Sequence, residues 1–152
     1  MMRFLDGAMG DILPSALSIT QALSFTIACD RAFSSRLFNK NIYRLSSSFG
    51  YRSDPFTGRS KRHTGVDFAM KPGNRLYATG DGVIESVKFE LFGYGNQVII
   101  DHGFGYKTRY AHLKAVGVVE GTKIKRGECI GQSGNSGKSS GPHLHYEVIY
   151  KD

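Results

Sequence analysis

Hydrophobic and polar positions change their pattern about one third of the way along the chain. Residues 14–38 contain no glycine and mix Leu, Ile, Phe and Ala with polar residues, which predicts one helix or a broken pair of helices. Beyond the serines at 46–48, short β-type runs recur roughly every ten residues and are separated by glycines. This spacing predicts an all-β sandwich or barrel rather than alternating β and α units.

The second region carries all of the expected strands. They fall at Gly65–Met70, Arg75–Thr79, Gly82–Leu91, Asn96–Asp101, Tyr106–Leu113, Val116–Glu120, Cys129–Gln132 and His143–Tyr150. The stretch Asp101–Tyr106 has the composition of a hairpin connection, and Gly131–Gly141 is a Gly/Ser-rich loop that leads into the last strand. The expected fold class is therefore mainly β, with a compact antiparallel sandwich or barrel-like domain at residues 45–152. A short helical or irregular N-terminal segment at residues 1–44 precedes it.

Composition places the chain among soluble globular proteins and leaves room for one domain. It has 152 residues, of which 40% are hydrophobic and 22% charged. The chain has a net charge of +7, and the excess of positive charge lies in residues 31–63, which contain eight basic residues and one Asp. This excess favours an anionic partner. A basic nucleic-acid-binding β domain is one such interpretation, but no aromatic and basic motif of the RRM or cold-shock type is present.

The cellular compartment cannot be assigned from composition. No run of 18 apolar residues exists, so no membrane-spanning helix is expected. The N-terminus carries Arg3 against Asp6 and Asp11, whereas a signal peptide begins with positive charge. Cys29 and Cys129 are too few for a disulfide framework, and either one bridge or two thiols would fit.

Three short patterns contain the candidate chemistry. His143 and His145 begin a predicted strand, so their imidazoles project from one face together with Glu147. His63 and Asp67 stand four apart around a glycine and converge if the chain turns there. Each pattern alone is weak, because a solvated Asp or a hydrogen-bonded structural histidine is the better explanation of it. The same holds for His112, which ends another predicted strand.

Taken together, the patterns are more specific than they are apart. His63, Asp67 and His145 offer two nitrogens and one oxygen, the ligand set of a catalytic zinc with its fourth position left for water. His112 and His143 would then remain unligated, where imidazoles suit general acid and base work. Glu147 either orients a ligand imidazole or is simply solvated.

The arrangement resembles the M23 family of zinc metallopeptidases, the lysostaphin-like or LytM-type peptidoglycan endopeptidases. The likeness extends from about Leu45 to Tyr150, and its motifs occur in the family's order. They are Ser48–Arg52, His63 with Asp67, Tyr77–Val83, Tyr110–Leu113, Ile130–Gly137 and Gly141–Glu147.

The resemblance implies a role for each candidate residue. His63, Asp67 and His145 would bind one zinc ion, and His112 and His143 would flank the scissile amide as the catalytic pair. The implied fold is a compact antiparallel β domain with a groove over the metal. The implied partner is a peptidoglycan peptide in the bacterial cell envelope, periplasmic or extracellular. A monomer is expected, with no nucleic acid and no transmembrane segment.

Other interpretations stay open at this point. A catalytically silent wall-binding or hydrolase-activating module would share the fold, although such modules usually lose a ligand or a catalytic histidine. The family domain usually continues past its last strand, whereas this chain stops at Asp152, which indicates a fragment or a small single-domain member. The bond that is cut stays open, as does the role of residues 1–44, whether inhibitory or a remnant of export.

Overall fold

The computed structural model describes residues 43–151, and these residues form twelve β-strands without an α-helix. The helix expected at residues 14–38 lies outside the described residues. Within the described part, no helix is long and apolar enough to cross a membrane. The strands are β1 (Tyr43–Ser47), β2 (Gly50–Ser53), β3 (Ser60–His63), β4 (Val66–Met70), β5 (Arg75–Tyr77), β6 (Gly82–Lys88), β7 (Gln97–Gly103), β8 (Tyr106–Ala111), β9 (Leu113–Val116), β10 (Lys123–Ile124), β11 (Cys129–Ser133) and β12 (His143–Tyr150).

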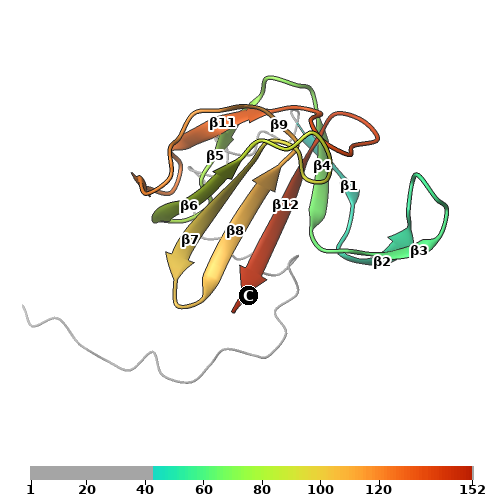
Figure 1. Ribbon diagram of the computed structural model, residues 1–152, viewed down its shortest axis with the longest axis horizontal. Helices are drawn as coiled ribbons and strands as arrows, with labels where there is room; N and C mark the ends of the chain where they lie inside the picture. Colours follow the sequence, from blue (N-terminus) through green and yellow to red (C-terminus); the bar gives the residue numbers. More distant parts are fainter. Residues whose placement is uncertain (1–42, 152) are drawn as a thin grey trace, which may run out of the picture.

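The strands make three sheets, and every pair in them is antiparallel. The largest sheet has the order β1-β4-β12-β8-β7-β6-β10, so the last long strand lies near its middle. A smaller sheet has the order β5-β11-β9, and β2 and β3 form a separate hairpin. Figure 1 shows β5, β9 and β11 together at one end of the large sheet, while the β2–β3 hairpin projects to the side beside β1 and β4.

The core lies on one face of the large sheet because side chains alternate along each strand. In β12, Leu144 and Tyr146 are buried in the core, whereas His143, His145 and Glu147 belong to the opposite face. In β4 the same alternation buries the side chains on either side of Asp67. The core residues are Val66, Phe68, Leu76, Ala78, Ile84, Val98, Ile100, Tyr110, Leu113, Ile124, Ile130, Leu144 and Tyr146. One face of β12 thus packs in the core, and its other face carries the candidate site residues.

The predicted strands are confirmed with one exception. The exception is Val116–Glu120, where the strand β9 instead ends at Val116 and the three following residues have no regular structure. The valines there suggested a strand, but Val119 is 73% exposed and pairs with no neighbouring strand. The run predicted at Tyr106–Leu113 is interrupted at His112, whose φ of 61° turns the chain from β8 into β9.

The expected fold class of an antiparallel β domain is confirmed by these sheets. Five strands escaped prediction: β1, β2, β3, β9, which the predicted runs touch only at its two end residues, and the two-residue β10. The first three are mainly exposed and polar, so no alternating apolar pattern marks them. The division of the chain into residues 1–44 and 45–152 stays a prediction, because residues 1–42 lie outside the described part.

Candidate metal centre

The three predicted metal ligands come from neighbouring strands. His63 ends β3, Asp67 lies in β4, and His145 lies in β12. Asp67 and His145 are direct partners in the antiparallel register, so their side chains project side by side from the same face. Gly65 makes this convergence possible, because a methyl group there would collide with the His145 ring and the Tyr146 carbonyl.

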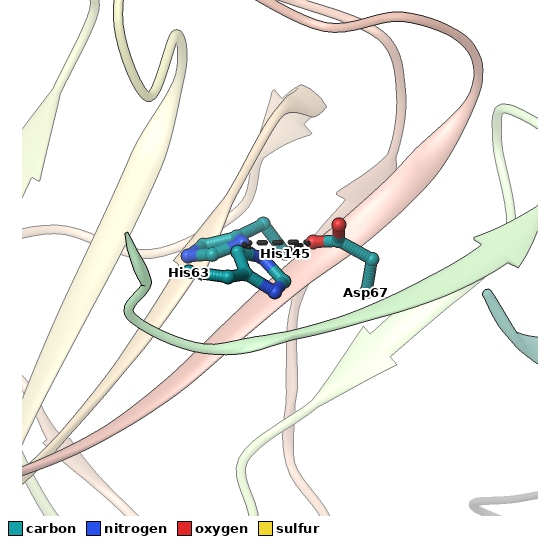
Figure 2. Close-up of side chains that lie close together, drawn as sticks. All are labelled: His63, Asp67 and His145. Atoms are coloured by element: carbon teal, nitrogen blue, oxygen red, sulfur yellow. Dashed lines mark hydrogen bonds and ion pairs between the residues drawn. The ribbon is translucent and has the colours of Figure 1, made fainter. Parts of the chain in front are cut away.

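The three side chains meet at one point and are all buried. His145 Nδ1 lies 2.8 Å from Asp67 Oδ1, and His63 Nε2 lies 3.1 Å from the same oxygen. The two ring nitrogens are 3.1 Å apart. Figure 2 shows both imidazoles on one side of the Asp67 carboxylate. Ligand atoms around a tetrahedral zinc ion at its usual bond lengths lie about 3.3 Å apart, so the cluster is close to the size of a zinc shell.

Hydrogen bonds behind the two imidazoles determine which nitrogen faces the centre. His63 Nδ1 lies 2.8 Å from the Ser48 carbonyl oxygen, and His145 Nε2 lies 3.0 Å from a Glu147 carboxylate oxygen. Both partners only accept, so these nitrogens carry hydrogen and the neutral rings turn their lone pairs inward. Two lone pairs and one carboxylate oxygen then converge on one point, which requires a cation between them. The residues present therefore fit a bound zinc ion.

Electrostatics at the cluster favour a positive charge even without metal. Burial alone would raise the pKa of Asp67, but its hydrogen bonds with His145 and His63 outweigh burial and hold that pKa well below the usual range. Burial alone would lower the pKa of His145, but the Asp67 and Glu147 carboxylates on either side of the ring raise it. In the metal-free protein these two carboxylates thus shift the pKa of His145 in the direction that favours its charged form.

Glu147 is a buried carboxylate with four partners. Besides His145, it accepts hydrogen bonds from Tyr94 Oη at 2.8 Å, from Arg109 Nη1 at 2.7 Å and from the Thr64 hydroxyl. Burial by itself would raise the pKa of Glu147, but these hydrogen bonds and the Arg109 charge lower it to about 2. Glu147 is therefore ionised at neutral pH and orients His145, and the solvated alternative is wrong because its exposed fraction is 3%.

His112 lies beside the cluster in an unusual backbone conformation. Its φ of 61° is uncommon for a residue other than glycine, and its amide donates to the Tyr94 carbonyl at 2.9 Å. Its Nδ1 lies 2.7 Å from the Ser136 carbonyl oxygen, so Nδ1 carries hydrogen and Nε2 is the free ring nitrogen. Burial lowers the pKa of His112 to about 4 against the opposing effect of that carbonyl, so the ring is neutral at neutral pH.

His143 lies next to His112, with 4.6 Å between the ring centroids. Its Nδ1 lies 2.7 Å from the Gly141 carbonyl oxygen, which therefore accepts a hydrogen bond from this nitrogen. Its Nε2 lies 3.6 Å from Asp67 Oδ1. The rings of His112 and His143 are thus each oriented by a hydrogen bond to a loop carbonyl oxygen. The Ser48 carbonyl oxygen orients the His63 ring in the same way.

All five predicted residues line one open groove of about 330 Å³. One wall is the β2–β3 hairpin, from Arg52 to Arg62, and a second is the loop at residues 138–140. A third wall consists of Gly93 and Tyr94. The Gly/Ser-rich loop predicted at Gly131–Gly141 thus supplies part of the groove wall. The fifth histidine, His102, does not line the groove and forms hydrogen bonds with the Asp81 carbonyl and the Thr108 hydroxyl.

Sequence reasoning missed the partners that hold Glu147 in place behind His145. Tyr94 and Arg109 reach Glu147 from other parts of the chain, and Arg109 also lies 4.3 Å from the centroid of the Tyr94 ring. Arg109 is the register partner of Glu147 in the β8–β12 pair, so an opposite-charge pair across two strands was available as a signal. It could be used only after the register was known.

Comparison with known proteins identifies the family of this domain. The model for peptidase family M23 matches residues 61–152. The chain is 46% identical over 110 residues to the peptidoglycan DD-endopeptidase ShyA of Vibrio cholerae, an alignment that covers 72% of this chain and 25% of that protein. It is 48% identical over 105 residues to the DD-carboxypeptidase/endopeptidase Mpg of Neisseria meningitidis, covering 69% of this chain and 24% of the relative. The chain thus spans about a quarter of the length of these relatives.

Solved structures agree with the sequence matches. The fold is similar to a zinc-containing peptidase from Vibrio cholerae, with a TM-score of 0.68 and 41% identity over 74% of this chain and 35% of that one. It is similar to the catalytic domain of lysostaphin from Staphylococcus simulans, with a TM-score of 0.69 and 31% identity over 78% of this chain and 87% of that one. With the family model covering more than half of its residues, the chain belongs to peptidase family M23.

Proposed function

We propose that this protein is a zinc-dependent endopeptidase that hydrolyses peptide bonds in the stems or cross-links of bacterial peptidoglycan. The observation that carries this proposal is the convergence of two imidazole lone pairs and one carboxylate oxygen on a buried point at the groove. A second pair of imidazoles stands beside it. Membership of family M23 and the names of the relatives support the same activity and substrate.

His63, Asp67 and His145 would hold the zinc ion. When bound there, zinc supplies Lewis acidity toward a peptide carbonyl and lowers the pKa of water to about 7. The chain supplies the orientation, because the Ser48 carbonyl and the Glu147 carboxylate keep each ligand nitrogen turned inward.

His112 and His143 would move the protons. His112 is neutral at neutral pH and its Nε2 is free, so this nitrogen accepts a proton from the attacking water. His143, whose Nε2 lies 3.6 Å from Asp67 Oδ1, would take the complementary role and donate a proton to the leaving amine. The carbonyl oxygens of Ser136 and Gly141 each accept a hydrogen bond from Nδ1 of one ring, which leaves Nε2 of both rings for proton transfer.

The groove suits a wall peptide. It is open along the metal cluster, and basic side chains from the β2–β3 hairpin and from the loop at 138–140 line it. Wall peptides are extended and carry carboxylates, so an open groove with basic side chains in its walls favours them over a globular substrate. Action in the bacterial cell envelope follows from this substrate. The expected monomer stays a prediction.

The experiment that tests the function uses the zinc-loaded chain and purified wall fragments of known cross-linking. We expect mass analysis of the products to show a single type of cleaved peptide bond and no cleavage of glycan. The His143→Ala variant serves as the control for contaminating hydrolases. A protein that binds zinc, binds wall fragments and cuts none of them would instead be the silent wall-binding module.

A further inference from the structure

The mouth of the groove contains a compact group of charged and aromatic side chains, here called the mouth cluster: Asp54, Phe56, Lys61 and Lys138. All four line the same groove as the metal ligands. Lys138 Nζ lies 4.8 Å from the centroid of the Phe56 ring, and Lys61 Nζ lies 3.9 Å from Asp54 Oδ2. The cluster therefore joins the hairpin wall of the groove to its loop wall.

Asp54 does not neutralise the two lysines. Its Oδ1 accepts three hydrogen bonds within its own turn, from the Phe56 amide at 2.9 Å, the Thr57 amide at 2.9 Å and the Thr57 hydroxyl at 3.2 Å. Its Oδ2 is too far from Lys61 Nζ for a hydrogen bond. Among residues 43–151, no carboxylate oxygen lies within 4.0 Å of Lys138 Nζ. The cluster has two ammonium groups and one carboxylate, so it carries an excess positive charge and N–H donors that are not used within it.

The backbone holds Lys138 in a fixed place relative to the metal cluster. Its amide donates to the Gly93 carbonyl oxygen at 2.9 Å, and Gly137 packs so closely on Gly95 that a side chain would not fit. The next residue on the 93–95 segment, Tyr94, has its ring 5.6 Å from that of His145. The loop wall is thus attached to the segment that contacts a metal ligand.

Positive charges outnumber negative ones along the whole groove. Four cationic side chains line it, namely Arg52, Arg62 and the two lysines of the mouth cluster, against the carboxylates of Asp54 and Asp67. With neutral histidines the lining carries a net charge of +2, and a bound divalent cation would increase that value. A groove with this excess attracts an anionic segment of substrate.

We propose that Lys61 and Lys138 form an anion subsite, with the Phe56 ring as its apolar wall, that binds a free carboxylate of the peptide substrate. This inference rests on the proposed function and adds a substrate class to it: peptides with a free carboxylate close to the scissile bond. Exposed ammonium groups form charge-assisted hydrogen bonds with carboxylates, and the aromatic face holds the aliphatic part of the lysine chain and of the substrate.

The test compares two peptides that differ only at this group. One contains a D,D-peptide bond whose leaving residue carries a free α-carboxylate, and the other has that carboxylate converted to a carboxamide. With the zinc-loaded full chain we expect KM for the carboxamide to be about three- to tenfold higher. In the Lys61→Gln/Lys138→Gln variant this KM ratio falls toward 1. Raising the salt concentration reduces the ratio in the unaltered protein, because the subsite is open to solvent.

The matched control is Lys123→Gln, which removes an exposed lysine from β10 at the far edge of the large sheet. We expect it to keep the KM ratio of the unaltered protein. Equal KM values for the two peptides in the unaltered protein, or a ratio that survives the double substitution, would overturn the inference while leaving the proposed function intact.

If neither peptide is cleaved, the proposed function fails and binding decides the inference separately. Isothermal titration calorimetry of the two peptides should then still show tighter binding of the carboxylate form and loss of that difference in the double variant. Equal binding of both peptides to the unaltered protein would reject the subsite as well.

Discussion

The metal cluster and the mouth cluster lie in the same groove but are built in opposite ways. His63, Asp67 and His145 are buried, come from strand positions, and have each polar atom assigned to a partner. The lysines of the mouth cluster are exposed, stand on a projecting hairpin and a loop, and keep donors free. The difference shows how one domain separates two tasks: the sheet determines a rigid geometry, and the loops supply adjustable charge.

The largest expected effect follows from removing a ligand of the metal cluster. His145→Ala should abolish tight zinc binding and lower cleavage by at least about a thousandfold, because two ligands remain and Asp67 loses a buried partner. Metal analysis after gel filtration and the rate of wall-fragment cleavage measure both effects. His102→Gln is the control, since that ring bonds only outside the cluster. Retained cleavage by His145→Ala would refute the assignment of the ligand.

Substitution of His112, which lies beside the proposed metal ligands, should lower the catalytic rate without removing the metal. His112→Ala is expected to keep stoichiometric zinc and to lower kcat by about 10²- to 10⁴-fold, the usual contribution of a general base. Zinc content and kcat are measured on the same sample. Loss of zinc together with activity would assign His112 to the metal shell instead.

Acid should destabilise the metal-free protein through Glu147. Its pKa of about 2 lies below the ordinary value of 4.5, so its ionised form contributes stability that is complete above pH 4.5. That stability is lost as the pH falls toward 2, and a shift of this size corresponds to about 3 kcal/mol. Urea unfolding with a chelator present, between pH 5 and 2.5, measures it. A free energy of unfolding that stays constant over this range would contradict the buried, ionised Glu147.

Removing the charge of Glu147 should loosen the metal without removing a ligand. Glu147→Gln keeps the shape of the side chain but weakens its hold on His145, so we expect zinc affinity to fall about 10- to 100-fold. Competition with a chromogenic chelator measures the affinity. Asp101→Asn, in β7, which β8 separates from β12, lies away from the groove and serves as the control for loss of one carboxylate. Unchanged affinity in Glu147→Gln would mean that His145 is oriented by packing alone.

The smallest effect belongs to the mouth cluster. Lys138→Gln should change zinc affinity by less than about twofold, because an exposed charge outside the ligand shell is screened by solvent. The same chelator competition applies. A fall in zinc affinity as large as that expected for Glu147→Gln would show that the charge of Lys138 acts directly on the metal cluster. The two clusters would then not be independent.

Most of the strands of this domain could be predicted from local pattern. The roles of the five histidine and aspartate positions came from combining the motifs and from the resemblance to family M23, because each motif alone favoured a structural interpretation, and these roles stay predictions. The runs at Val66–Met70 and His143–Tyr150 alternate clearly, because one face of each is core. The polar strands β1 to β3 could not be predicted, because they are held by pairing with β4 and with each other rather than by burial. The predicted strand at Val116–Glu120 was wrong because valine content does not supply a pairing partner.

The sequence by itself determined which groups are available: imidazoles and a carboxylate at strand positions, glycines at the close approaches, and an excess of positive charge before His63. Only the tertiary structure decided which groups act together. The β4–β12 register places Asp67 opposite His145, and the β8–β12 register brings Arg109 to Glu147. The physical reason is that tautomers, pKa values and unneutralised lysines depend on neighbours far apart in the sequence, which are determined by strand pairing rather than by local pattern.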